Sequence, residues 1–173
     1  EKGEQEGAIV MAETQTRGKG RLGRKWVSPK TGGIYASLIL RPDAEMDEIP
    51  AVTLIAGLAI IKAIKKTCGL EARIKWPNDI LIEGRKVCGI LTEVKAQPDR
   101  VDFLVLGIGI NVNTSIKNIP KEATSLKQET GREVKRSELL KHVLEEVEKA
   151  YIKFTKKGFS ALRDECRNAS MVI

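Results

Sequence analysis

The segment that most limits the fold of this chain is an almost wholly apolar stretch over residues 49–66. Pro50 suits a first helical turn, lysines gather in the last turn, and Gly69 follows, so the stretch predicts one helix with clear start and stop signals. A helix that is apolar on nearly every side must be covered on nearly every side. The rest of the chain must therefore build a layer around it.

Composition narrows the class of protein. The uncharged part of this stretch, residues 49–61, is 13 residues long, whereas a membrane span needs roughly 18 to 20 apolar residues; we expect no membrane anchor and no signal peptide. A chain of 173 residues with 42% hydrophobic and 31% charged residues is one globular domain, not a disordered or collagen-like chain. Its three cysteines fit neither a disulfide framework nor a zinc site. We therefore expect the protein to be located in the reducing cytoplasm.

The remaining patterns predict short strands and two more helices. A helix with Ser137 as its N-cap should run to about Lys157, and a shorter one should lie near 159–167. Short turns between strands imply antiparallel neighbours. The chain is therefore expected to be an α+β domain, with a mostly antiparallel or mixed sheet packed on helices. The expected strands cover residues 8–12, 34–41, 71–76, 80–83, 86–94 and 101–110.

The net charge of +7 is concentrated in one segment. Between Thr14 and Pro42 there are seven lysines and arginines and no acidic residue, and the rest of the chain is balanced. A neutral body with one cationic stretch indicates that this stretch meets an anion: a phosphate, a carboxylate or nucleic acid.

Residues 18–26 within this stretch read Gly-Lys-Gly-Arg-Leu-Gly-Arg-Lys-Trp. Alternating glycines and cations let the backbone approach an anion while lysine and arginine supply charge and hydrogen bonds. The spacing fits neither a Walker loop nor a dinucleotide fingerprint. A solvated basic loop explains the run about equally well, and Trp26 could be either the wall of an apolar pocket or a core anchor.

A second motif is the run Lys-Trp-Pro-Asn-Asp at residues 75–79. On a strand, Ile74 and Trp76 should face one way and Lys75 the other, where Pro77 ends the strand. Strand ends beside turns often carry functional side chains. Taken alone, a surface lysine beside a turn is the more common explanation.

A third motif, Gly-Ile-Gly-Ile-Asn, occupies residues 107–111 at the end of an apolar strand. In a regular strand Gly107, Gly109 and Asn111 share one face, leaving bare backbone against which a flat ligand could lie and an amide to read its edge. A bulge or a crowded strand crossing explains the glycines equally well.

Other chemistries find little support. The single histidine, His142, falls in mid-helix, so a Ser-His-Asp triad or a histidine-based metal site has little to work with. The nearby Glu145, Glu146 and Glu148 indicate a helix face rather than a catalytic pair.

In this order the three motifs resemble the catalytic domain of biotin protein ligases. Residues 15–26 are similar to the family's Gly-Arg-Gly-Arg-x-Gly-Arg-x-Trp loop, with Lys19 in place of its first arginine, and the other two motifs match Lys-Trp-Pro-Asn-Asp and Gly-x-Gly-Ile-Asn. The resemblance runs from Ala8 to about Ser125 and implies the class II aminoacyl-tRNA synthetase-like fold of that family. It makes residues 1–173 a catalytic domain, in which we find neither the family's Ser-Thr-Asn segment, nor its small C-terminal β-barrel, nor the winged-helix DNA-binding module of some members.

The resemblance implies a two-step ligation with biotin and ATP as substrates and with Mg²⁺. Biotin carboxylate attacks the α-phosphate, and a lysine of biotin carboxyl carrier protein then attacks the biotinyl-adenylate. Lys75 would bridge the carboxylate and the α-phosphate, and Arg21 would act with it as a catalytic cation; no metal ligand is singled out. The implied binding residues are Gln15, Gly18, Lys19, Gly20, Arg21, Trp26, Lys75, Gly89, Gly107, Gly109 and Asn111.

Two alternatives stay open. A lipoate or octanoate ligase or transferase shares the fold and the active-site lysine, but the full loop with its tryptophan and the intact Lys-Trp-Pro-Asn-Asp run favour biotin. A nucleic-acid-binding module would suit the pI of 9.4, but seven aromatic residues offer few stacking platforms and the charge outside the loop is balanced. A homodimer is compatible with the family.

Overall fold

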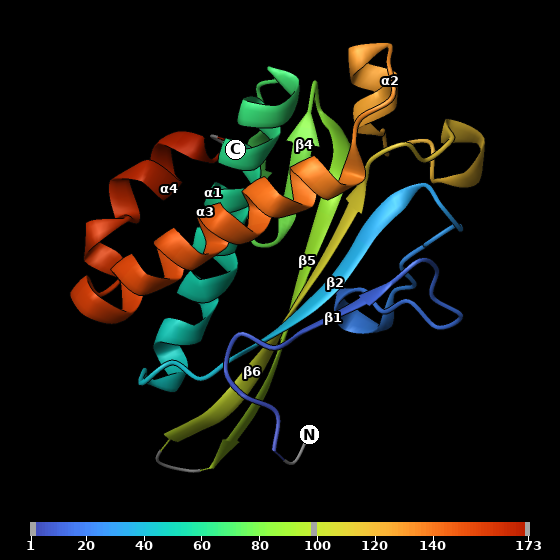
Figure 1. Ribbon diagram of the computed structural model, residues 1–173. Helices are drawn as coiled ribbons and strands as arrows, with labels where there is room; N and C mark the ends of the chain where they lie inside the picture. The colour runs from blue at the N-terminus through green and yellow to red at the C-terminus, as the bar shows by residue number, and fades with distance from the viewer. Residues whose placement is uncertain (1–2, 98–99, 172–173) are drawn as a thin grey trace.

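The computed structural model describes residues 3–97 and 100–171. These residues form one six-stranded sheet in the order β1-β2-β6-β5-β4-β3, with every neighbouring pair antiparallel, and helices packed against it (Figure 1). The predicted α+β class is confirmed. The strands are β1 (Ile9–Ala12), β2 (Gly33–Leu40), β3 (Arg73–Lys75), β4 (Asp79–Ile82), β5 (Arg85–Gln97) and β6 (Arg100–Asn111).

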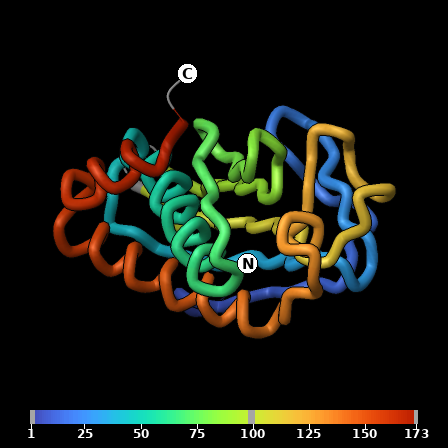
Figure 2. Tube along the Cα trace, turned by 90° about the horizontal axis from the view of Figure 1, so that it is seen from above, coloured from blue at the N-terminus to red at the C-terminus, as the bar shows by residue number. Residues whose placement is uncertain are grey.

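The two longest helices lie together on one side of the molecule, while most of the segment between β1 and β2 lies away from them (Figure 2). Among the helices of the described residues, α1 (Ile49–Cys68) and α3 (Arg136–Lys157) are the longest, and α2 (Leu126–Thr130) and α4 (Arg163–Ala169) are short. None of the helices in the described ranges is long and apolar enough to cross a bilayer.

The apolar stretch forms α1, as predicted. Pro50 lies in its first turn, and Gly69 ends it in the left-handed conformation, where its N–H bonds to the Lys65 carbonyl. Gly57 lets the sheet approach closely, because a Cβ there would meet the ends of Ile74 and Ile80 at 3.3–3.4 Å. The helix is therefore covered by the sheet on one side, and α3 packs against it as well.

The start of α3 differs from the prediction. Ser137 lies inside the first turn, and Lys135 is the N-cap, its carbonyl accepting from the N–H groups of Glu138 and Leu139. At this start the Arg136 guanidinium donates to the Gly33 carbonyl and pairs with Glu13. The predicted short helix is divided into a 3₁₀ turn (Phe159–Ala161) and α4.

The long β5–β6 hairpin forms the middle of the sheet. On β6, alternate side chains are buried beneath the helices and the others face the open side. The register places Gly89 opposite Gly109 and Leu91 opposite Gly107. This pairing brings glycines of two strands together on the open face.

Candidate active site

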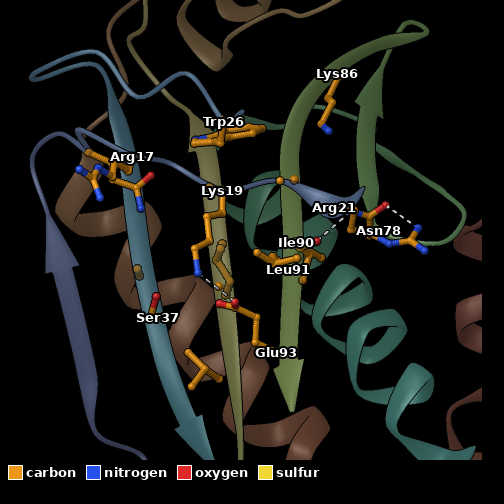
Figure 3. Close-up of a pocket in the computed structure, with 18 residues that line it drawn as sticks. Arg17, Lys19, Arg21, Trp26, Ser37, Asn78, Lys86, Ile90, Leu91 and Glu93 are labelled. Atoms are coloured by element: carbon orange, nitrogen blue, oxygen red, sulfur yellow. Dashed lines mark hydrogen bonds and ion pairs between the residues drawn. The ribbon is translucent and has the colours of Figure 1, made fainter. Parts of the chain in front are cut away.

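A pocket of about 280 Å³ lies on the open face, between the sheet and the segment that joins β1 to β2 (Figure 3). A second cavity of about 900 Å³ shares much of this lining and extends beneath the segment itself. The pocket is lined by Gln15, Arg17, Lys19, Gly20, Arg21, Trp26, Ala36, Ser37, Asn78, Lys86, Gly89, Ile90, Leu91, Glu93, Val105, Gly107, Ile108 and Gly109.

Glycine backbone and one indole ring form the floor. A Cβ on Gly109 would lie 2.6 Å from Cε2 of Trp26, and a Cβ on Gly89 would lie 3.0 Å from its Cζ3. The indole can therefore lie against the sheet only because both positions lack a side chain. Within the described part of the chain, the Trp26 Nε1–H is buried without a hydrogen-bond acceptor. The floor thus combines a flat apolar surface with an unused donor.

The glycine-rich segment, expected to be an irregular loop, has internal order. At its base the Thr14 hydroxyl donates to the Ser28 carbonyl (2.7 Å), and the Ser28 hydroxyl donates to Oε1 of Gln15 (3.1 Å). Farther out, the Trp26 N–H bonds to the Gly18 carbonyl at 2.9 Å. The segment is therefore a two-stranded arm that holds its cations over the pocket.

Two contacts fix the arm across β5 (Figure 3). On one side Lys19 Nζ lies 3.4 Å from Oε1 of Glu93, and on the other Arg21 Nη1 lies 3.5 Å from Oδ1 of Asn78. Asn78 is itself anchored, because its amide donates to the Ile90 carbonyl at 2.8 Å. Both contacts of the arm are long and exposed, so they hold it weakly.

Lys86 is a lining residue that the sequence analysis did not select. Its ammonium lies 2.6 Å from the Asp79 carboxylate and 5.5 Å from the centre of the Trp26 ring. Strict alternation from Ile90 would turn Lys86 toward the helices, but a bulge in the β4–β5 pairing inserts Val87 as an extra residue. The bulge redirects Lys86 to the open face, next to Gly89.

Lys75 is not among the residues that line the pocket, although it lies on the face of β3 opposite the buried Ile74, as predicted, and is in register with Asp79. Lys75 lies on β3, the edge strand, separated from β5 by β4, and its side chain is exposed. Trp76, expected to share the face of Ile74, is 66% exposed while Ile74 is 1% exposed. The alternation ends because β3 stops at Lys75 and Trp76 belongs to the following turn.

Asn111 is also outside the pocket, although it shares the face of Gly107 and Gly109. It is 2% exposed, and its amide donates to the Thr124 carbonyl at 3.1 Å. The Thr124 N–H in turn bonds to the Lys86 carbonyl at 2.8 Å. Asn111 therefore supports the backbone of Lys86 through Thr124, while its Oδ1 is buried without a hydrogen-bond partner among the described residues.

The other predicted residues gather as expected. Gln15, Lys19, Gly20, Arg21, Trp26, Gly89, Gly107 and Gly109 all line the pocket, and Gly18 lines the adjoining cavity. Four cations from the arm and from β5 surround a flat apolar floor. Such a site suits a ligand with an apolar body and an anionic end.

The described residues do not form a metal centre of their own. Nowhere in residues 3–97 or 100–171 do three or more histidine, cysteine, aspartate or glutamate side chains gather in a way that could hold an ion. Mg²⁺ is commonly bound through substrate phosphates with few protein ligands.

Fold and site together define an α+β domain in which a pocket with a glycine and tryptophan floor lies under a cationic arm. The chain belongs to the Biotin/lipoate A/B protein ligase family, whose pattern matches residues 1–111.

Individual relatives carry more specific names. The bifunctional ligase/repressor BirA of Bacillus subtilis is 43% identical over 162 residues, covering 91% of this chain and 50% of that protein. The biotin--[acetyl-CoA-carboxylase] ligase of Paracoccus denitrificans is 41% identical over 107 residues, covering 61% of this chain and 44% of that protein. The chain thus spans about half the length of these relatives.

A solved structure agrees with this placement. Biotin protein ligase from Aquifex aeolicus, in complex with biotin and ATP, superposes with a TM-score of 0.86 at 35% identity, covering 98% of this chain and 71% of that chain.

Proposed function

We propose that this chain is the catalytic part of an enzyme that joins biotin to a lysine of a carrier protein, using ATP. The observation that carries the proposal is the pocket, in which a glycine and tryptophan floor lies under four cations. The floor suits the thioether ring and hydrocarbon chain of biotin, and the cations suit its carboxylate and a triphosphate. The names of the relatives support the same substrates.

In the first step a carboxylate oxygen of biotin attacks the α-phosphorus of ATP, an O–P bond forms, and pyrophosphate leaves. The two reactants repel each other, so catalysis needs cations between them. Our proposal gives the bridging position to Lys86 rather than Lys75, because Lys86 lines the pocket. Asp79 orients the Lys86 ammonium, and Lys19 and Arg21 close over the phosphates from the arm.

In the second step the acceptor lysine loses a proton and its amine attacks the acyl carbon of the adenylate. An amide C–N bond forms, the C–O bond to the phosphate breaks, and AMP leaves; the nitrogen releases a second proton. The Trp26 ring would keep the acyl group in place while AMP departs. Mg²⁺, when bound with ATP, would neutralise phosphate charge, and no step assigned to this chain depends on it.

The proposal is limited in its partners. The acceptor is a biotin carboxyl carrier-type protein. The repressor activity in the name of the Bacillus relative is not carried over, since about half of that protein is unmatched. A cytoplasmic site of action is in keeping with three free cysteines.

The test is ATP–pyrophosphate exchange by the full-length protein, measured with biotin, lipoate and octanoate in turn. We expect exchange with biotin alone. Exchange with lipoate or octanoate instead would assign the other branch of the family. Absence of exchange with all three acids would overturn the proposal.

A further inference from the structure

Glu93 is the one carboxylate-bearing residue among the described residues that line the pocket; its charged neighbours there are Arg17, Lys19, Arg21 and Lys86. It lies on β5, four residues after Gly89 and two after Leu91, and so faces the same open side. A site built only to hold two anions has no use for a carboxylate at its edge. Glu93 is therefore expected to contact a cation.

In the structure that partner is Lys19 of the arm (Figure 3). The pair is long, at 3.4 Å, and both side chains are more than half exposed, at 73% and 54%. Such pairs contribute little to stability and exchange readily. Once a phosphate draws Lys19 away, Glu93 is left with an uncompensated charge at the mouth of the pocket.

The second step of the proposed reaction brings a further cation to this place. The acceptor lysine is an ammonium ion in water, and four nearby positive charges oppose its approach. We propose that Glu93 receives the ammonium of the acceptor lysine after the adenylate has formed, replacing its contact with Lys19. This inference rests on the proposed function and adds a binding residue for the second substrate.

The experiment uses full-length enzyme loaded with biotinyl-adenylate and freed of unbound substrates. Transfer is measured against increasing acceptor domain and, separately, against hydroxylamine, a small nucleophile that is uncharged near neutral pH. The variants are Glu93→Gln, Glu93→Asp and the control Glu71→Gln. Glu71 is an exposed glutamate paired with Lys65, and it does not line this pocket.

We expect Glu93→Gln to raise the KM for the acceptor domain roughly fivefold or more, with kcat changed much less. Glu93→Asp should recover part of the loss, and Glu71→Gln should behave as wild type. Discharge by hydroxylamine from the preloaded enzyme should be unchanged in all three variants, because this step involves no cationic nucleophile.

Other outcomes overturn the inference. Equal acceptor KM values in wild type and Glu93→Gln would show that Glu93 does not hold the lysine. Slower adenylation in Glu93→Gln, or an altered Mg²⁺ requirement, would place Glu93 in the first step. A wild-type protein that forms no adenylate would instead overturn the proposed function itself, so the two failures are distinguishable.

Discussion

The two faces of β6 are built from opposite kinds of residue. On the helix face Leu104, Leu106, Ile108 and Ile110 are at most 3% exposed and fill the space beneath α1 and α3. On the open face, Gly107 and Gly109 leave the backbone bare, and an indole and charged side chains lie over it. One face of β6 thus fills the core with large side chains, and the other face leaves room for the pocket because it has glycines.

This difference separates stability from function within a single strand. A large side chain on the helix face stabilises by burial, about 1.5–3 kcal/mol for a fully buried aliphatic residue. A missing side chain on the open face costs backbone entropy and gains no burial. Mutations on the two faces should therefore have different consequences, and the following predictions test that division.

The largest effect should come from Lys86→Ala. Removing a cation from between two reacting anions should lower the rate of adenylation by about 10² to 10³. Thermal unfolding should change less than for a truncation in the core, since the ion pair with Asp79 that is lost is only partly buried. The measurement is single-turnover formation of adenylate from biotin and ATP.

Lys75→Ala is the matched comparison. The two lysines lie close together in the sequence, but only Lys86 lines the pocket. It should reduce adenylation less than about tenfold. The reverse order, with Lys75→Ala the more damaging variant, would return the bridging role to Lys75.

Ile108→Ala on the helix face should reduce the free energy of unfolding by an amount similar to the loss of transition-state stabilisation in Lys86→Ala. Ile108 is 3% exposed, and truncation of a buried isoleucine costs about 2–5 kcal/mol. Urea denaturation should show the loss as a lower midpoint with an unchanged slope. Leu106, which is fully buried on the same face and does not line the pocket, gives the functional control: folded Leu106→Ala protein, assayed well below its unfolding temperature, should retain most of its adenylation rate.

Gly109→Ala should reduce activity more than stability. The added methyl group would lie 2.6 Å from Cε2 of Trp26, so the indole must move off the floor. Adenylation should fall by at least about tenfold, a smaller loss than for Lys86→Ala, with less destabilisation than Ile108→Ala.

Gly107→Ala is the control for that change. Its new methyl group would meet the Leu91 carbonyl at 3.2 Å and not the indole, so its effect on adenylation should be smaller. Equal losses in the two glycine variants would mean that the strand, and not the seating of Trp26, is sensitive.

The sequence predicted the helix face better than the pocket. Alternation and apolar runs depend on the chain's own local period, so α1 and the strands could be placed to within a few residues. Gly107 and Gly109 could be assigned to one face for the same reason. Ser137 was wrong as an N-cap: α3 begins at Arg136, whose side chain contacts Glu13 and the Gly33 carbonyl, both remote in sequence.

Lys86 shows the limit more clearly. Its direction depends on a bulge, and a bulge exists only in the pairing of β5 with β4. The period of β5 alone assigns Lys86 to the wrong face. Asn111 was assigned to the correct face, but the segment around Thr124 that covers it could not be foreseen from the strand. Both cases depend on a neighbouring element.

The smallest effect on stability should come from the loss of an ion-pair cluster that joins three helices. Glu165 of α4 contacts Lys153 of α3 at 2.8 Å and Lys62 of α1 at 2.5 Å. Hydrogen bonds from Lys153 and Lys62 hold the pKa of Glu165 below its ordinary value of 4.5. Because the folded-state pKa is the lower one, the contribution to stability is complete above pH 4.5 and is lost as the pH falls through the folded-state value. The Glu165 side chain is 41% exposed, so solvent screening keeps the contribution below about 1 kcal/mol.

Glu165→Gln should therefore lower the free energy of unfolding slightly at pH 7 and not at all in acid, as measured by urea denaturation across this range. A loss as large as that of Ile108→Ala would show that charge, and not apolar burial, holds the helices to one another.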